Sequence, residues 1–198
     1  MISIYEIKPK FQQLLTPVLT ALYKAGITAN QITIASILLS FLIGVGFWHA
    51  DSHAILFLSL PIGLFIRMAL NALDGMMART YNQQSKTGEL LNELGDLVSD
   101  LFIFLPLLKF ERENLYLIIG FICLSMINEF AGLLGKVISG TRRYEGPMGK
   151  SDRAFVIGLY GLLCFLAIDF RPYSIWIFSV LILLLVISTA TRINKSLK

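Results

Sequence analysis

The feature that most constrains this chain is a series of long apolar runs separated by short polar loops. Hydropathy places six such runs at residues 31–48, 54–73, 90–108, 115–138, 155–170 and 174–191. About 20 apolar residues in a helix cross the hydrocarbon core of a bilayer. With 198 residues, 56% of them hydrophobic and only 15% charged, the composition excludes a disordered chain and disfavours a soluble single-core domain. The pattern predicts an all-α polytopic membrane protein with six transmembrane helices.

The segment before the first run predicts a helix of a different kind. Apolar residues recur every three or four positions between Phe11 and Leu22, and lysines accompany them. This pattern is typical of an amphipathic helix that lies on a membrane surface. We therefore expect one domain over residues 1–198, in which 1–28 form the juxtamembrane helix and 29–198 form the six-helix bundle.

Basic residues are distributed unevenly between the two sides of the predicted bundle. With the N-terminus inside, 13 of the 17 Lys and Arg residues lie in inside segments, 3 lie outside and Arg67 lies within a run. The positive-inside rule therefore predicts that both termini are cytoplasmic. In a membrane protein, a net charge of +4 indicates contact with anionic lipid rather than nucleic acid, so we expect a lipid bilayer and no nucleic acid as partners.

Acidic residues occur where a membrane protein normally avoids them. They lie within the runs or at their cytoplasmic ends and are Asp74, Glu89, Glu93, Asp96, Asp100 and Glu129. Such carboxylates normally face the bundle interior and have a partner. Asn92, Asp96 and Asp100 share one helical face because they are spaced by four. Three interpretations remain open from composition: a Mg²⁺ or Mn²⁺ site, structural ion pairs in which Arg67 neutralises Asp74 or Asp96, and a proton or cation pathway.

The order of residues around the second loop favours the divalent-ion site. The stretch reads Asn71-x-x-Asp74-Gly75-x-x-Ala78-Arg79, then eight residues, then Gly88-x-x-x-Asn92-x-x-x-Asp96-x-x-x-Asp100. It resembles the signature of the CDP-alcohol phosphotransferase family, which has aspartate where this chain has Asn71 and Asn92. The likeness includes six spans, a preceding surface helix and a Gly26-x-Thr28-x-Asn30 segment, in which we expect Asn30 to cap the first span.

The resemblance implies an enzyme of phospholipid biosynthesis. Such an enzyme moves a phosphatidyl group from a CDP-alcohol, most simply CDP-diacylglycerol, to a polar alcohol and releases CMP. The family's metal ligands correspond to Asn71, Asp74, Asn92 and Asp96, and Asp96 is also the implied catalytic base. Its nucleotide-binding positions correspond to Gly75, Ala78, Arg79 and Gly88. Because Asn71 and Asn92 carry no charge, we expect one or two Mg²⁺ or Mn²⁺ ions.

Two further segments carry predictions about partners. Arg142, Arg143, Lys150 and Arg153 precede the fifth run; they indicate either cytoplasmic topology or a pocket for an anionic acceptor, such as a phosphorylated polyol. The small residues at 131, 132 and 135 suit close helix packing, including a homodimer contact.

The departures from the signature leave other functions open. Asn71 and Asn92 motivate a catalytically weak or inactive member that binds nucleotide or lipid as a scaffold. A small transporter is a third hypothesis, weakened because the acids gather at one side. The resemblance also implies a place among small bacterial inner-membrane members of the family, with the active site facing the cytoplasm.

Overall fold

The computed structural model describes residues 4–198, and side chains from Lys10 onward, as eight α-helices and three 3₁₀-helices with no strand in that range. The helices are α1 (Ile4–Lys24), α2 (Ala29–Trp48), η1 (Ala54–Leu58), α3 (Ser59–Thr80), α4 (Lys86–Phe104), α5 (Leu107–Phe110), η2 (Arg112–Asn114), α6 (Leu115–Ser139), α7 (Lys150–Phe165), η3 (Arg171–Tyr173) and α8 (Ser174–Ser196). The predicted all-α class is confirmed over these residues. Residues 1–3 of the predicted juxtamembrane segment lie outside them.

Side-chain caps decide where α2 and α4 begin. Thr28 Oγ1 accepts a hydrogen bond from the backbone N of Gln31 at 3.3 Å, and Gln31 Oε1 accepts one from the Thr28 N at 2.9 Å. This reciprocal pair is a capping box. The predicted cap at Asn30 is therefore wrong, because Asn30 already lies inside the first turn. Ser85 caps α4 with a single hydrogen bond, which its side chain accepts from the Gly88 N at 3.0 Å.

The fifth predicted run, 155–170, is shifted relative to α7. This helix begins at Lys150, where Asp152 Oδ2 accepts a hydrogen bond from the Gly149 N at 3.0 Å, and it ends at Phe165. Ala167 then adopts a left-handed conformation with φ of 53°. Hydropathy missed the first turn because the residues that open this helix are polar and charged.

Four helical segments are long and apolar enough to span a bilayer: Ala29–Trp48, Ala54–Thr80, Arg112–Ser139 and Arg171–Ser196. α4 fails this criterion because of its acidic residues, and α7 because it has only 16 residues. The chain is thus a helical membrane protein, and the count of six spans stays a prediction.

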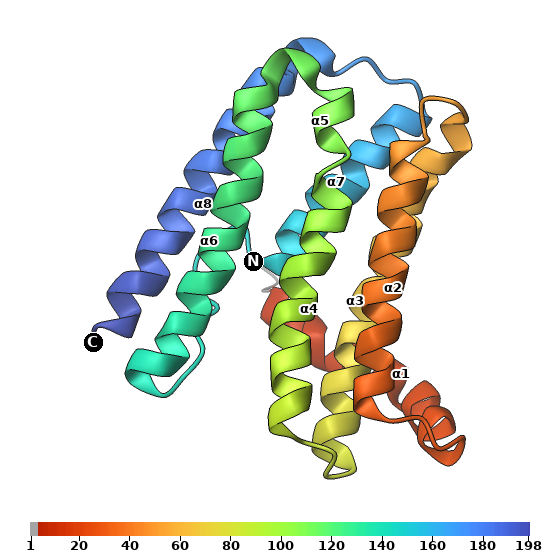
Figure 1. Cartoon of the computed structure of the whole chain (residues 1–198), viewed down its shortest axis with the longest axis vertical. Coiled ribbons are helices and arrows are strands. Elements are labelled where there is room, and N and C mark those ends of the chain that lie inside the picture. Colours follow the sequence, from red (N-terminus) through yellow and green to blue (C-terminus); the bar gives the residue numbers. More distant parts are fainter. Residues whose placement is uncertain (1–3) are drawn as a thin grey trace.

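The helices form a bundle with two closely packed parts (Figure 1). α2 packs against both α3 and α4, and α3 packs against α7, whereas α6 and α8 run side by side as a pair. We call the end of the bundle where α2 and α4 begin and α3 ends the motif end. α1 lies across this end and contacts α3 (Figure 1). Its predicted placement on a membrane surface stays a prediction.

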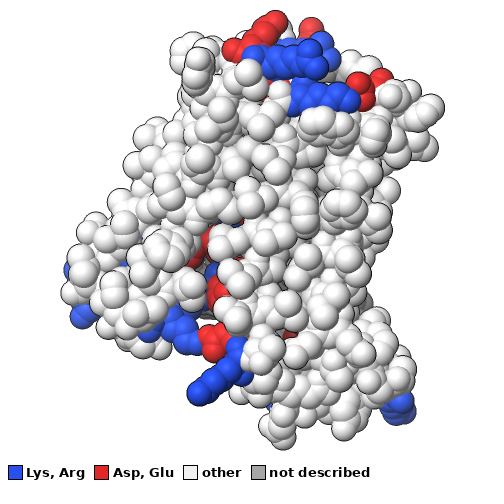
Figure 2. Space-filling view, in the orientation of Figure 1, with Lys and Arg blue, Asp and Glu red and all other residues white. Residues whose placement is uncertain are grey.

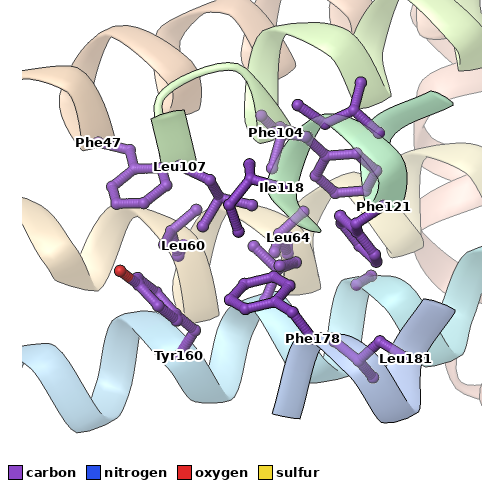
Figure 3. Close-up of a cluster of buried hydrophobic side chains, with 14 of the residues drawn as sticks. Phe47, Leu60, Leu64, Phe104, Leu107, Ile118, Phe121, Tyr160, Phe178 and Leu181 are labelled. Carbon is purple, nitrogen blue, oxygen red and sulfur yellow. The ribbon is translucent and has the colours of Figure 1, made fainter. Parts of the chain in front are cut away.

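The larger of two apolar clusters (Figure 3) lies mainly in the half of the bundle away from the motif end, and the smaller one packs α1 against α2 and α3. Phe47, Leu60, Phe104, Phe121 and Phe178 come from five different helices and are each at most 2% exposed. Most of the buried charged side chains lie in the other half, whereas Glu111 is a buried acid in the apolar half, where Tyr160 and Ser174 donate hydrogen bonds to it. In Figure 2 the side of the molecule is almost free of charged atoms, except for a furrow in its lower part that shows acidic and basic atoms together.

Candidate functional site

Asp74 is the buried acid at the centre of the motif end. Its side chain is carried by α3, faces α2 and is 4% exposed. Thr33 of α2 donates a hydrogen bond to Asp74 Oδ2 at 3.0 Å, whereas Asp74 Oδ1 is buried without a hydrogen-bond partner. One turn earlier on α3, Asn71 Oδ1 accepts from Ser36 at 2.8 Å. A buried carboxylate oxygen without a partner is costly, so Asp74 Oδ1 is a candidate ligand for a cation or a hydrogen-bond donor.

A cavity of about 490 Å³ opens beside Asp74. Its lining includes all four predicted nucleotide-binding residues, two predicted metal ligands and residues of α2, among them Asp74, Gly75, Ala78, Arg79, Gly88, Asn92, Asn30 and Thr33. This volume is in the range of small-molecule and cofactor sites, about 300–1,000 Å³. The structure therefore brings the two halves of the motif together around one space. Asn71 and Asp96 lie outside the lining of this cavity.

Gly88 lets α4 approach the start of α2. A Cβ atom at Gly88 would lie 2.6 Å from Asn30 Oδ1 and 3.0 Å from Ser85 Oγ. Gly88 belongs to the first turn of α4, and the absence of a side chain there permits close packing at the cavity wall.

Asp96 and Asp100, one and two turns deeper on α4 than Asn92, are held by basic side chains. Lys150 contacts Asp96 Oδ1, and Arg67 Nη2 lies 3.9 Å from the same oxygen. Asp100 is 3% exposed and lies between Arg67 and Arg153, each at 2.8 Å. The predicted pairing of Arg67 with Asp74 is therefore not observed, and its closer partner is Asp100 rather than Asp96.

Glu129 of α6 is a further acid that is surrounded by basic side chains. Arg142, Arg153 and Arg192 approach its carboxylate at 2.9, 3.0 and 3.6 Å. Arg142 also contacts Glu93 of α4. These contacts join four acids and five bases into one ion-pair network, whose members are Glu93, Asp96, Asp100, Glu129, Arg67, Arg142, Lys150, Arg153 and Arg192.

Three of the four predicted acceptor residues, Arg142, Lys150 and Arg153, belong to this network. Arg143 does not: it donates to Ser139 Oγ at 3.0 Å and lies 3.8 Å from Glu145. The structure therefore separates the basic loop into a part that faces the polar interior and a part that packs against the end of α6.

Several polar residues of the site were not among the predicted ones. Thr33 and Ser36 hold Asp74 and Asn71, and with Ser40 they form a polar stripe on one face of the otherwise apolar α2. Their spacing of three and four residues indicates one polar face on this helix and could have been recognised in the sequence. Arg192 of α8 is 2% exposed, although the distribution of basic residues predicts only that it lies in a cytoplasmic segment. Its inward position follows from the packing of α8 on α6.

The small residues of α6 serve packing within the chain. A Cβ at Gly132 would lie 2.6 Å from the Arg143 carbonyl oxygen, and one at Gly135 would lie 2.5 Å from Arg143 Cγ and 2.8 Å from Ser196 Oγ. This face is therefore already covered, and it gives no support to the expected homodimer contact, which stays a prediction.

The donor set suits a divalent ion only in part. Among the described residues, no group of three or more His, Cys, Asp or Glu side chains is arranged to hold a metal ion. Asp74 offers a free carboxylate oxygen, and Asn71 and Asn92 offer neutral amide oxygens. Asp96 is already neutralised by Lys150. The arrangement fits one carboxylate-anchored ion better than two.

The fold and the site together define a helical membrane protein with carboxylate and amide side chains beside a cavity of about 490 Å³. More specifically, the chain belongs to the CDP-alcohol phosphatidyltransferase family, because a sequence model of that family matches residues 26–193. The resemblance stated from the motif is thereby confirmed. The family consists of transferases of phosphate-containing groups.

The chain is also similar in sequence to two named proteins. The Escherichia coli K12 inner membrane protein YnbA is 45% identical over 195 residues, which are 98% of this chain and 96% of that protein. The archaetidylinositol phosphate synthase of Pyrococcus horikoshii is 35% identical over 95 residues, 48% of each chain.

Solved structures share the fold. Phosphatidylinositol phosphate synthase PgsA1 of Mycobacterium tuberculosis, in complex with manganese and citrate, has a TM-score of 0.74 and 19% identity, covering 92% of this chain and 88% of that one. The same enzyme with CDP-DAG bound has a TM-score of 0.73 and 20% identity, covering 93% and 94%.

Proposed function

We propose that this protein transfers the phosphatidyl group of CDP-diacylglycerol to an alcohol acceptor and releases CMP. The observation that carries the proposal is the cavity at the motif end, which gathers the motif glycines, Arg79 and the unpartnered oxygen of Asp74 around one nucleotide-sized space. Family membership supports the reaction class. The CDP-DAG bound to the PgsA1 structure, which shares this fold, supports the choice of lipid donor.

The cavity wall is suited to a nucleotide diphosphate. Gly75 and Ala78 leave the surface of α3 without bulk, and Arg79 carries a guanidinium that can bind phosphate oxygens in a bidentate manner. Gly88 keeps the opposite wall close. We propose that these four residues bind the CDP moiety.

Asp74 is the proposed anchor for a divalent ion, with Asn71 and Asn92 as neutral oxygen donors and Asp96 as a further ligand once Lys150 releases it. When bound, Mg²⁺ or Mn²⁺ would neutralise the diphosphate oxygens and stabilise the departing CMP. Asp74 Oδ1 fits this role because it is buried and lacks a partner, while Thr33 fixes the orientation of the same carboxylate.

Asp96 is the proposed general base. As the acceptor oxygen forms its bond to the phosphorus that carries the lipid, the bond to CMP breaks and the acceptor proton passes to the Asp96 carboxylate. Lys150 must first release this carboxylate. Its side chain is 29% exposed, more than that of the other bases in the ion-pair network. Lys150 would then stand at the mouth of the site, where Arg142 also lies.

The proposed topology follows from the same arrangement. We propose that all six long helices α2, α3, α4, α6, α7 and α8 cross the inner membrane, with the motif end in the cytoplasm. The distribution of Lys and Arg supports this orientation, and the inner-membrane relative YnbA supports the location. α1 would then lie along the cytoplasmic membrane surface.

The direct test is release of CMP from labelled CDP-diacylglycerol by purified protein with Mg²⁺ or Mn²⁺ and a panel of alcohols. We expect acceptor-dependent CMP release that Asp96→Ala abolishes. The matched control is Glu111→Gln, which removes a buried carboxylate at the opposite end of the bundle. Absence of CMP release with every acceptor, in protein that is folded and loaded with metal, contradicts the proposal.

A second candidate is a non-catalytic member that binds nucleotide or lipid. The observation in its favour is that Lys150 occupies Asp96 and that Asn71 and Asn92 remove two negative charges from the motif. Asn71→Asp combined with Asn92→Asp separates the candidates. If wild type binds CDP but releases no CMP and the double variant gains turnover, the scaffold is correct.

A further inference from the structure

Glu129 lies outside the motif and is surrounded by three arginines. Its carboxylate is 7% exposed and lies within 3.6 Å of Arg142, Arg153 and Arg192. A cluster of three guanidinium groups would otherwise be a strong site for a phosphate group. In this chain the place that such an anion would take is filled by a side chain of the protein itself.

The charges of the ion-pair network nearly cancel. Its four acids and five bases leave one positive charge. A phosphorylated acceptor would add about two negative charges at neutral pH. Its phosphate could bind the arginines only by displacing the Glu129 carboxylate, which would then be buried and unpaired.

The reachable part of the network suits a neutral ligand. Its two accessible acids, Glu93 and Asp96, are 18% and 16% exposed, and its two accessible bases, Arg142 and Lys150, are 14% and 29% exposed. Arg153 and Arg192 are at most 2% exposed. Figure 2 shows acidic and basic atoms side by side in the furrow. Hydroxyl groups donate to carboxylates and accept from guanidinium groups, so a polyol can satisfy both kinds of atom without adding charge.

We propose that Glu129 determines acceptor specificity by neutralising the arginines, so that the protein selects an uncharged polyol and rejects a phosphorylated one. This inference rests on the proposed function for the identity of the reaction. It assigns Glu129 a positioning role, because the carboxylate acts through Arg142 and Arg153.

Matched acceptor pairs test the proposal. With CDP-diacylglycerol as donor, glycerol is compared with glycerol 3-phosphate, and a hexitol with its monophosphate. We expect wild type to favour the uncharged member by at least about tenfold in kcat/KM, and Glu129→Gln to shift this ratio at least about tenfold toward the phosphorylated member. Glu111→Gln should leave the ratio unchanged. Equal or better use of the phosphorylated acceptors by wild type overturns the proposal.

A binding measurement keeps the two proposals distinguishable. Inorganic phosphate is titrated by calorimetry into protein in nanodiscs. We expect no binding to wild type at millimolar phosphate, binding to Glu129→Gln, and loss of that binding when Arg142→Gln is added. If no acceptor yields CMP, the proposed function fails and this titration alone decides on Glu129. If Glu129→Gln does not fold, wild type decides: phosphate binding overturns the inference, and its absence supports it.

Discussion

The buried guanidinium of Arg153 joins the two parts of the bundle. It donates to Asp100 Oδ2 at 2.8 Å, Glu129 Oε1 at 3.0 Å and the Met148 carbonyl at 3.1 Å, and its side chain is 1% exposed. Arg153→Met keeps an unbranched side chain and removes all of these donors. Removing one partner of a buried ion pair costs about 3–5 kcal/mol, because the other charge stays buried.

For Arg153→Met we expect a loss of unfolding free energy near the lower end of that range. Asp100 retains Arg67 at 2.8 Å, and Glu129 retains two other arginines, so neither carboxylate becomes fully unpaired. We therefore expect Arg153→Met to lower the free energy of unfolding by about 3 kcal/mol. Arg153→Lys should cost less, since it keeps the charge but loses the forked geometry.

Reversible unfolding in detergent, followed by tryptophan fluorescence, measures this difference. Lys109→Met is the matched control, because Lys109 pairs at 2.7 Å with Asp51, whose side chain is 49% exposed, and such surface pairs contribute little. An unchanged unfolding midpoint for Arg153→Met would refute the reasoning. It would mean that water or rearranged arginines solvate Asp100 and Glu129 in the variant.

Three other changes probe the site and the opposite end. Asp74→Asn keeps the shape of the side chain but removes its charge, so we expect loss of Mn²⁺ binding by calorimetry; retained affinity would exclude Asp74 as the anchor. Gly88→Val should raise the KM for the CDP-lipid at least about tenfold, since its Cβ would meet Asn30 Oδ1 at 2.6 Å; an unchanged KM would contradict the assigned cavity wall. The hydrogen bond from Lys109 holds the pKa of the Asp51 carboxyl below its ordinary value of 3.8. The stability that Asp51 contributes should therefore persist from pH 7 to about pH 5 and disappear only as the pH falls through that lowered pKa; thermal unfolding of wild type and Asp51→Asn across pH checks this.

The existence of the helices could be predicted because each buries an apolar face over many residues. Their boundaries could not, since these depend on a few polar contacts. α7 begins at Lys150, five residues before the predicted run, because Asp152 caps the Gly149 N. α4 ends at Phe104, just before Pro106, although the apolar run continues. Hydropathy identifies segments whose side chains are apolar, whereas capping residues and prolines determine where the helical backbone begins and ends.

The motif residues around the cavity could also be predicted, because the family resemblance supplied their spacing. The partner of Arg67 could have been found from helix geometry alone. α3 runs toward the motif end and α4 runs away from it. Arg67 lies seven residues before Asp74, which places it about 10 Å deeper at about 1.5 Å per residue. Asp100 lies eight residues beyond Asn92 on α4 and therefore reaches a similar depth. By contrast, the inward position of Arg192 depends on how α8 packs against α6, which no local pattern records.

The two asparagines of the motif and the ion-pair network both reduce the amount of positive charge that bound metal ions must supply. A site with four carboxylates needs external cations to be stable inside a bundle, since unpaired buried acids are costly. This chain has amides at Asn71 and Asn92 and binds Asp96 with its own Lys150. The ammonium group of Lys150 thereby supplies part of the positive charge that metal ions would otherwise supply. Asp74 is left as the one motif carboxylate with an unpartnered buried oxygen. Dependence on divalent ions should therefore concentrate at Asp74, while the rest of the polar interior is held by arginine and lysine.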